Sequence, residues 1–225
     1  MTDKKKILIV EDHPIFRWGL SELINQEPDL VVCGDATDVS GAWKAIEWFK
    51  PDLIIADITL ENSDGIELTK EVTRRNKGIP VLILSMHDQF LYAERALHAG
   101  ARGYIMKQEA MESVVTAIRQ VLAGKIYLNE KVKDQILFNL ADRPAGNNRS
   151  PLDRLTDREL EVFRMIGKGF STREIASKLH LSIKTIGTYR ERIKEKLNLK
   201  HANELVRHAV HWEKTGEIPD EAPLL

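Results

Sequence analysis

Five short apolar runs, rich in β-branched residues, alternate with longer stretches of helical spacing along the first half of the chain. The runs lie at 6–10, 30–34, 53–56, 81–84 and 103–106. This alternation is typical of βαβ units, in which helices join parallel strands and cover both faces of the sheet. The sequence therefore predicts an α/β unit with a doubly wound, five-stranded parallel sheet.

Three of the intervening stretches carry apolar residues at helical spacing. They are Phe16, Leu20, Leu23 and Ile24; Trp43, Ile46 and Phe49; and Val114, Ile118, Val121 and Leu122. Pro51 and Pro80 stand just before the third and fourth runs. A helix must have ended there, because proline lacks the amide donor and restricts the residue before it.

Polar residues follow four of the five runs. Glu11 and Asp12 follow the first, Asp57 the third, Ser85 the fourth and Lys107 the fifth. The carboxyl ends of parallel strands open onto one edge of the sheet, so these side chains are expected to share one pocket. Any one of them alone is more often a turn former or a solvated charge, but their joint occurrence favours a functional site.

Such a pocket suits a divalent cation and a phosphoryl group. Mg²⁺ prefers oxygen ligands, which Asp12 and Asp57 supply, with Glu11 acting directly or through water. With the cation bound, Asp57 can attack a phosphoryl donor and form an acyl phosphate, while Lys107 offsets the charge of the transferring group. The hydroxyl of Ser85 is placed to bond a phosphoryl oxygen.

Composition indicates an ordinary globular protein with an uneven charge. Residues 1–150 carry 19 Lys and Arg against 22 Asp and Glu, whereas residues 151–214 carry 14 against 9. A basic C-terminal module suggests an anionic partner such as nucleic acid.

The single Cys33 is expected to fill the core, and the absence of a signal-like or membrane-spanning run predicts a cytoplasmic protein.

The N-terminal part resembles the receiver domain of bacterial two-component response regulators, a flavodoxin-like fold. Residues 6–14 resemble the opening motif of that family and residues 99–107 its closing motif. The resemblance implies that Asp57 is the phosphoacceptor, and that Asp12, Asp57 and the backbone carbonyl of Thr59 hold Mg²⁺ with help from Glu11. It also implies that Ser85 and Tyr104 form a switch pair beside Lys107, although a strand tyrosine commonly only packs.

Two positions depart from the receiver pattern. Glu61 stands where many receivers have proline, four residues after Asp57, and Gln108 replaces a common proline after Lys107. Neither change removes a catalytic group. Glu61 adds a negative charge near the pocket mouth, which leaves metal affinity and acyl-phosphate lifetime open.

The chain is expected to divide into a receiver at 1–125, a connecting helix and linker at 126–150, a helical module at 151–215 and a flexible tail at 216–225. The stretch 139–150 is poor in apolar residues and rich in turn formers, which predicts a linker.

Three helix starts with capping chemistry follow the linker. Thr156 with Glu159 and Ser171 with Glu174 fit capping boxes, and Ser182 fits an N-cap. Gly169 fits the end of the first helix, and residues 179–182 form a tight connection between the next two. This is the outline of an all-α helix-turn-helix domain.

The third helix has one apolar and one polar face. Its packing face is predicted to hold Ile183, Ile186, Ile193 and Leu197. Its free face is predicted to hold Lys184, Thr188, Glu191 and Glu195, flanked by Thr185 and Arg192. A basic helix face is often only solvated, but with these caps and the short connection, insertion into the DNA major groove is the better interpretation.

Residues 155–197 closely resemble the LuxR-type DNA-binding domain, and the two modules together resemble NarL/FixJ-type response regulators. The candidate DNA-binding residues are Lys184, Thr185, Gly187, Thr188, Tyr189, Arg190, Arg192 and Lys194. Family members often contact the groove at positions 187, 188 and 191, with lysine common at the first, so base specificity does not carry over. In the next helix Leu205, Ala209 and Trp212 are candidates for dimerisation or, equally, for the intramolecular core.

The sequence thus predicts a DNA-binding response regulator rather than a multi-turnover enzyme. Expected partners are a sensor histidine kinase or phosphotransfer protein, double-stranded promoter DNA, RNA polymerase and a second copy of the chain, without a membrane. Two alternatives stay open: a constitutive DNA-binding protein, and an aspartyl-phosphate phosphohydrolase. The second is disfavoured because haloacid-dehalogenase phosphatases have an acid where this chain has Thr59.

Overall fold

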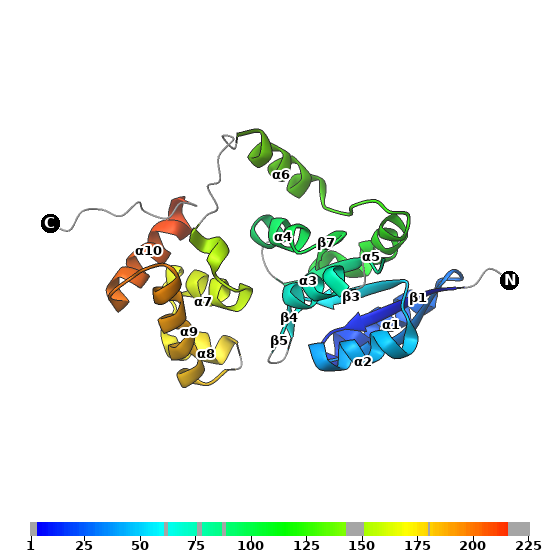
Figure 1. Ribbon diagram of the computed structural model, residues 1–225, viewed down its shortest axis with the longest axis horizontal. Coiled ribbons are helices and arrows are strands. Elements are labelled where there is room, and N and C mark those ends of the chain that lie inside the picture. Colours follow the sequence, from blue (N-terminus) through cyan, green and yellow to red (C-terminus); the bar gives the residue numbers. More distant parts are fainter. Residues whose placement is uncertain are drawn as a thin grey trace. The chain divides into compact units, whose positions relative to one another are not determined.

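The computed structural model describes residues 4–60, 63–75, 78–86, 89–142, 151–179 and 181–215. The chain forms two compact units, Met1–Pro144 and Ala145–Leu225 (Figure 1). Several sequence predictions fall outside the described residues, namely those on Glu61, on His180 within the 179–182 connection, on linker residues 143–150 and on the tail 216–225.

The first unit is built on a five-stranded sheet with the order β2-β1-β3-β6-β7, in which every neighbouring pair is parallel. Its strands are β1 (Lys5–Val10), β2 (Leu30–Ala36), β3 (Leu53–Asp57), β6 (Val81–Ser85) and β7 (Gly103–Met106). The predicted sheet is therefore confirmed. A two-residue pair, β4 (Thr59–Leu60) and β5 (Ser63–Asp64), forms a small antiparallel hairpin that is too short for a sequence pattern to indicate.

Helices cover both faces of this sheet (Figure 1). On one face α1 (Pro14–Asn25) and α5 (Lys107–Leu122) pack through Leu20 and Val114 against Ile9 and Ile55. Helices α2 (Val39–Phe49), α3 (Gly65–Arg75) and α4 (Gln89–His98) also pack against the strands. The central strands are buried on both faces, which explains their continuous apolar sequence.

The segment after α5 returns to the sheet. The amide of Tyr104 donates to the carbonyl of Tyr127 at 3.0 Å, and the amide of Tyr127 donates to Arg102 at 2.9 Å. This pairing covers the edge of β7, which would otherwise expose unpaired backbone groups. Helix α6 (Glu130–Asp142) follows and packs on α4. Because α6 runs to Asp142, the prediction that the linker begins at Asn139 was wrong.

The second unit contains a short 3-10 turn, η1 (Pro151–Arg154), and four helices. These are α7 (Asp157–Gly167), α8 (Thr172–Lys178), α9 (Ile183–Lys196) and α10 (Ala202–Thr215). Both capping boxes form as predicted, and Ser182 accepts a hydrogen bond from the amide of Thr185. Gly169 adopts a φ of 85°, and the amide of Phe170 donates to Met165, which closes the end of α7.

The core of the second unit lies between α7, α9 and α10. Phe163, Ile186, Ile193 and Leu205 are fully buried there. Ile183 was predicted to share the packing face of α9, but it is 52% exposed. A helical wheel gives the face on which a residue lies but not whether a neighbouring helix covers it, so it did not decide the burial of Ile183.

A Gly167→Ala change is expected to destabilise the second unit. A Cβ at Gly167 would lie 2.5 Å from the carbonyl oxygen of Ala209, so α7 and α10 would have to separate. Overpacking of this kind costs about 1–3 kcal/mol. Thermal unfolding of the full chain measures the loss. Gly187→Ala is the matched control: its Cβ meets open space in a helix interior, so it should stabilise by up to about 1 kcal/mol. Equal effects of the two changes would contradict this account.

Candidate functional site

Three charged groups meet at the carboxyl edge of the sheet. Lys107 Nζ lies 2.8 Å from Asp57 Oδ2 and 2.7 Å from Glu11 Oε2. Glu11, Asp57 and Lys107 are exposed by only 1%, 3% and 7%. Burial of this kind is rare for charged side chains unless they are paired. The structure therefore brings together three of the residues predicted to share the pocket.

The fold sets each of these positions. Asp57 is the last residue of β3, and Glu11 follows β1, where its amide donates to Ala36 at 2.9 Å. Lys107 is the first residue of α5, directly after β7. The ring of Phe16 on α1 lies 4.9 Å from Lys107 Nζ, so an aromatic face also contacts the ammonium group.

The pocket holds more negative than positive charge. Burial and the nearby Glu11 raise the pKa of Asp57 to about 7, although Lys107 acts to lower it. Burial by itself would lower the pKa of Lys107, but the charges of Asp57 and Glu11 outweigh that effect and raise it. Lys107 is thus held as a cation, and Asp57 lacks full compensation. A further cation would relieve this imbalance.

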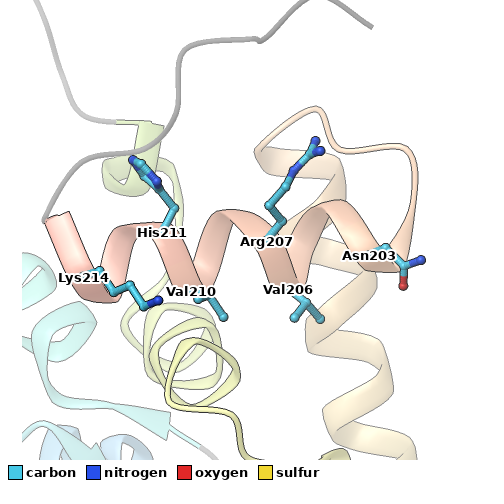
Figure 2. Close-up of a pocket in the computed structure, with 6 residues that line it drawn as sticks. All are labelled: Asn203, Val206, Arg207, Val210, His211 and Lys214. Atoms are coloured by element: carbon cyan, nitrogen blue, oxygen red, sulfur yellow. The ribbon is translucent and has the colours of Figure 1, made fainter. Parts of the chain in front are cut away.

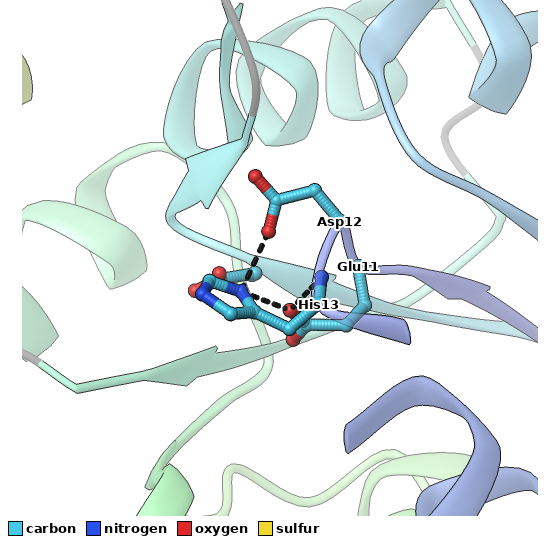
Figure 3. Close-up of side chains that lie close together, drawn as sticks. Glu11, Asp12 and His13 are labelled. Carbon is cyan, nitrogen blue, oxygen red and sulfur yellow. Dashed lines mark hydrogen bonds and ion pairs between the residues drawn. The ribbon is translucent and has the colours of Figure 1, made fainter. Parts of the chain in front are cut away.

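The imidazole of His13 lies against the carboxylates of Glu11 and Asp12 (Figure 3). Its Nδ1 lies 2.7 Å from Asp12 Oδ1 and 3.0 Å from Glu11 Oε1, and its side chain is 66% exposed. Ligand atoms of Glu11, Asp12, His13 and Asp57 all lie within 4.8 Å of one another. The sequence argument did not assign His13 a role. Its place directly after Asp12 was the available signal.

The other predicted pocket residues lie on neighbouring elements. The amide of Thr59, at the start of β4, donates to the carboxylate of Asp57. Ser85 ends β6, the neighbour of β3, and is completely buried. Tyr104 on β7 is 2% exposed and therefore turned inward. Gln108, the second residue of α5, is exposed.

Gly65 is a site residue that sequence reasoning missed. Its amide donates to Ile58 at 2.8 Å, and a Cβ there would lie 1.9 Å from the carbonyl oxygen of Asp57. Thr69 Oγ1 donates to the carbonyl of Gly65 at 2.7 Å and is fully buried. Only glycine allows α3 to begin directly against the phosphoacceptor candidate. The Asp64-Gly65 pair, a common turn sequence, was the signal.

Helix α9 presents a polar face to solvent. Lys184, Thr188, Glu191 and Arg192 are exposed, and Gly187 faces open space. Thr185, Tyr189 and Arg190 are partly buried. The side chain of Lys194 is only 17% exposed and its Nζ lies 2.7 Å from Glu191 Oε2. Half of the eight candidate DNA-binding residues are thus exposed or face open space, and Lys194 is largely covered.

A buried carboxylate fixes α9 to α7. Lys196 Nζ lies 2.6 Å from Glu159 Oε2, and the amide of Thr156 donates to the same oxygen at 2.8 Å. Glu159 is 2% exposed. The sequence argument assigned Glu159 only a capping role, because its partner Lys196 is 37 positions further along the chain.

The candidate dimerisation residues of α10 face inward. Leu205 and Ala209 are fully buried, and the Trp212 ring lies 6.0 Å from that of Phe163 on α7. Of the two alternatives left open by the sequence, the intramolecular core therefore applies to Leu205 and Ala209, whereas Trp212 is only partly buried. The outward face of α10 borders an open hollow lined by Asn203, Val206, Arg207, Val210, His211 and Lys214 (Figure 2).

None of the helices in the described part of the chain is both long and apolar enough to span a membrane.

Comparisons with known proteins agree with both modules. Residues 7–119 match the response regulator receiver domain, and residues 153–209 match the bacterial regulatory proteins of the luxR family. The oxygen regulatory protein NreC of Staphylococcus carnosus is 33% identical over 209 residues, which is 91% of this chain and 96% of NreC. The transcriptional regulatory protein DegU of Brevibacillus brevis is 30% identical over 92% of this chain and 94% of its own length.

Solved structures show the same relationship. A LuxR-family two-component response regulator from Aurantimonas sp. SI85-9A1 matches 62% of this chain and all of its own, at 31% identity and a TM-score of 0.58. The RcsB response regulator of Salmonella typhimurium matches 93% of this chain and all of its own, at 25% identity and a TM-score of 0.55. With a receiver domain followed by a LuxR-type DNA-binding domain, the chain belongs to the NarL/FixJ-type two-component response regulators.

Proposed function

We propose that phosphorylation of Asp57 by a sensor histidine kinase or phosphotransfer protein switches the DNA binding of this regulator. The observation that carries this proposal is the buried Asp57 carboxylate, held by Lys107 and crowded by Glu11. We assign the receiver to residues 1–125, the connecting helix and linker to 126–150, the DNA-binding domain to 151–215 and a flexible tail to 216–225. A regulator of bacterial DNA acts in the cytoplasm.

The donor set suits Mg²⁺. Carboxylates of Asp12 and Asp57, the carbonyl of Thr59 and the assisting Glu11 are hard oxygen ligands, and Asp57 sits in an excess of negative charge. When bound, Mg²⁺ would neutralise charge on the phosphoryl oxygens. The imidazole of His13 would have to release Asp12 and Glu11 as the ion enters, because it now lies against both.

The chain's own residues perform the transfer as follows. A carboxylate oxygen of Asp57 attacks the phosphorus of a phosphohistidine, a new O–P bond forms, and the N–P bond to the departing imidazole breaks. Lys107 balances charge on the phosphoryl group from its position 2.8 Å from Asp57. Because the receiver ends as the phosphorylated product, it acts as a phosphoryl acceptor rather than a multi-turnover enzyme.

The switch pair would be Ser85 and Tyr104. Ser85, at the end of β6, would bond a phosphoryl oxygen, and this would favour the inward position that the Tyr104 side chain already occupies. The amide of Tyr104 is bonded to Tyr127 in the segment that leads into α6. A shift of β7 would therefore reach α6 through backbone hydrogen bonds.

DNA binding would use the exposed face of α9. Lys184, Thr185 and Arg192 would contact the duplex beside Gly187 and Thr188, with Tyr189 and Arg190 at the flank. A second copy of the chain would bind through the outward face of α10, where Val206 is 40% exposed, instead of through the buried Leu205 and Ala209. Once bound to promoter DNA, the regulator would contact RNA polymerase.

Replacing the phosphoacceptor tests the proposal directly. Asp57→Asn is expected to abolish incorporation of label from a radiolabelled phosphodonor in the presence of Mg²⁺, because the amide is not a nucleophile. Asp35→Asn is a matched control: this carboxylate lies near the end of β2, is 54% exposed and pairs with Arg17. It should retain labelling. Label kept by Asp57→Asn would sink the assignment.

The metal-free pocket should make stability depend on pH. Since the folded pKa of Asp57 is about 7, far above its ordinary value, the folded state binds this proton more tightly than the unfolded chain. The unfolding free energy should therefore fall as pH rises from about 4 to about 7. In Asp57→Asn the unfolding free energy should fall less over this pH range. At pH 8 it should exceed that of the wild type by about 1–3 kcal/mol. Urea unfolding with a chelator measures it, and identical pH slopes in both proteins would contradict it.

The constitutive alternative makes a different prediction. Beryllofluoride with Mg²⁺ mimics the phosphoryl group, so it should raise the affinity of the wild type for its operator and leave Asp57→Asn unchanged. Fluorescence anisotropy at fixed salt measures both, since protein–DNA affinity depends strongly on salt. Equal affinity of the wild type with and without the mimic would instead favour constitutive binding.

A further inference from the structure

An acidic side chain, Glu191, lies on the polar face of α9 that is expected to meet DNA. Glu191 is 67% exposed and follows Lys184 and Thr188 along one side of α9, at spacings of seven and three residues. A Cβ added at Gly187, one turn earlier, would meet no atom within 4 Å, so there is open space beside the backbone there. A carboxylate at such a place would repel DNA phosphates unless it meets a hydrogen-bond donor.

The carboxylate of Glu191 is held in position. Its Oε2 lies 2.7 Å from Nζ of Lys194, one turn later, and the Lys194 side chain is only 17% exposed. A largely covered lysine has fewer conformations to choose from than a solvated one, so it anchors one oxygen of its partner. Among the described residues, no contact holds Oε1. One acceptor atom is therefore oriented and available.

Helix geometry places Glu191 within reach of the groove. A recognition helix contacts bases mainly with its N-terminal residues. From Ile183 to Glu191 the helix axis advances by about 12 Å, and the major groove is also about 12 Å wide. Glu195 lies about 6 Å further along the axis. Glu191 is thus the acidic residue of α9 nearer to the N-terminal end that enters the groove, and Glu195 lies one turn further from that end.

Only two bases offer a donor to a carboxylate in the major groove. An ionised carboxylate accepts hydrogen bonds and cannot donate. Guanine and thymine present acceptors to the protein, whereas cytosine presents its N4 amino group and adenine its N6 amino group. Adenine also presents N7, an acceptor, next to N6, which would repel the second carboxylate oxygen. Cytosine is therefore the best match.

We propose that Glu191 determines specificity by accepting a hydrogen bond from the N4 amino group of one cytosine in each operator half-site. The proposal rests on the assignment of α9 as the recognition helix. Lys194 acts as a positioning residue that holds the carboxylate, and Gly187 leaves space for the duplex to approach. The same carboxylate lowers affinity for sequences that lack the cytosine, so it increases discrimination.

The test is selection from a random double-stranded DNA library by the full chain with beryllofluoride and Mg²⁺ at fixed salt. The wild type should enrich a site with one strongly preferred cytosine per half-site. Glu191→Gln should change that position to adenine, because glutamine pairs with adenine N6 and N7. Glu191→Ala should lose the preference there, by about fivefold or more, while binding other sequences more tightly. All other positions of the site should stay unchanged.

Two further variants separate the possible failures. Glu195→Gln removes the same charge one turn later and should leave every base preference unchanged. Lys184→Ala should weaken binding to the selected site. An unchanged cytosine preference in Glu191→Gln and Glu191→Ala, or a changed preference in Glu195→Gln, would overturn the role of Glu191. If Lys184→Ala binds the selected site as tightly as the wild type does, and the Glu191 variants also have no effect, the assignment of α9 as the recognition helix would be overturned. Thermal unfolding confirms that each variant is folded.

Discussion

The receiver unit depends on one buried cation, Lys107, placed between two buried carboxylates. Its Nζ lies within 2.8 Å of both Glu11, which directly follows β1, and Asp57, which ends β3. Without this ammonium group, two desolvated carboxylates would face each other at the end of the sheet. The single positive charge of Lys107 cannot balance the negative charges of Glu11, Asp57 and Asp12 together. The pocket therefore retains an excess of negative charge, which favours the binding of a divalent cation.

A comparable contact orders the DNA-binding unit. Glu159 accepts hydrogen bonds from Thr156 and Lys196, so it caps α7 and ties the far end of α9 to it. The recognition helix is thus supported at its C-terminal end, while its N-terminal turns are free to meet DNA. The same division appears in α10, whose inner side builds the core and whose outer side borders the open hollow.

The strands and helix starts were predictable because their signals are local. Runs such as 53–56 are buried on both faces and are apolar throughout, and capping boxes join residues three apart. The pocket was predictable because parallel strands bring their carboxyl ends together. The failures have other causes. Burial of Leu205 and exposure of Ile183 depend on neighbouring helices, and the hairpin of Thr59–Leu60 with Ser63–Asp64 is too short to leave a pattern.

The sequence by itself determined the order of elements, the caps and the set of residues gathered at the sheet edge, since periodicity and strand polarity suffice for these. Only the tertiary structure decided the charge state and the spacing of the groups. The pKa of Asp57 depends on burial and on Glu11, which lies 46 residues away in the chain. Likewise, the contact of Lys196 with Glu159 and the close approach of Gly167 to Ala209 arise only when helices pack. Desolvation and contact between distant residues exist only in the folded chain.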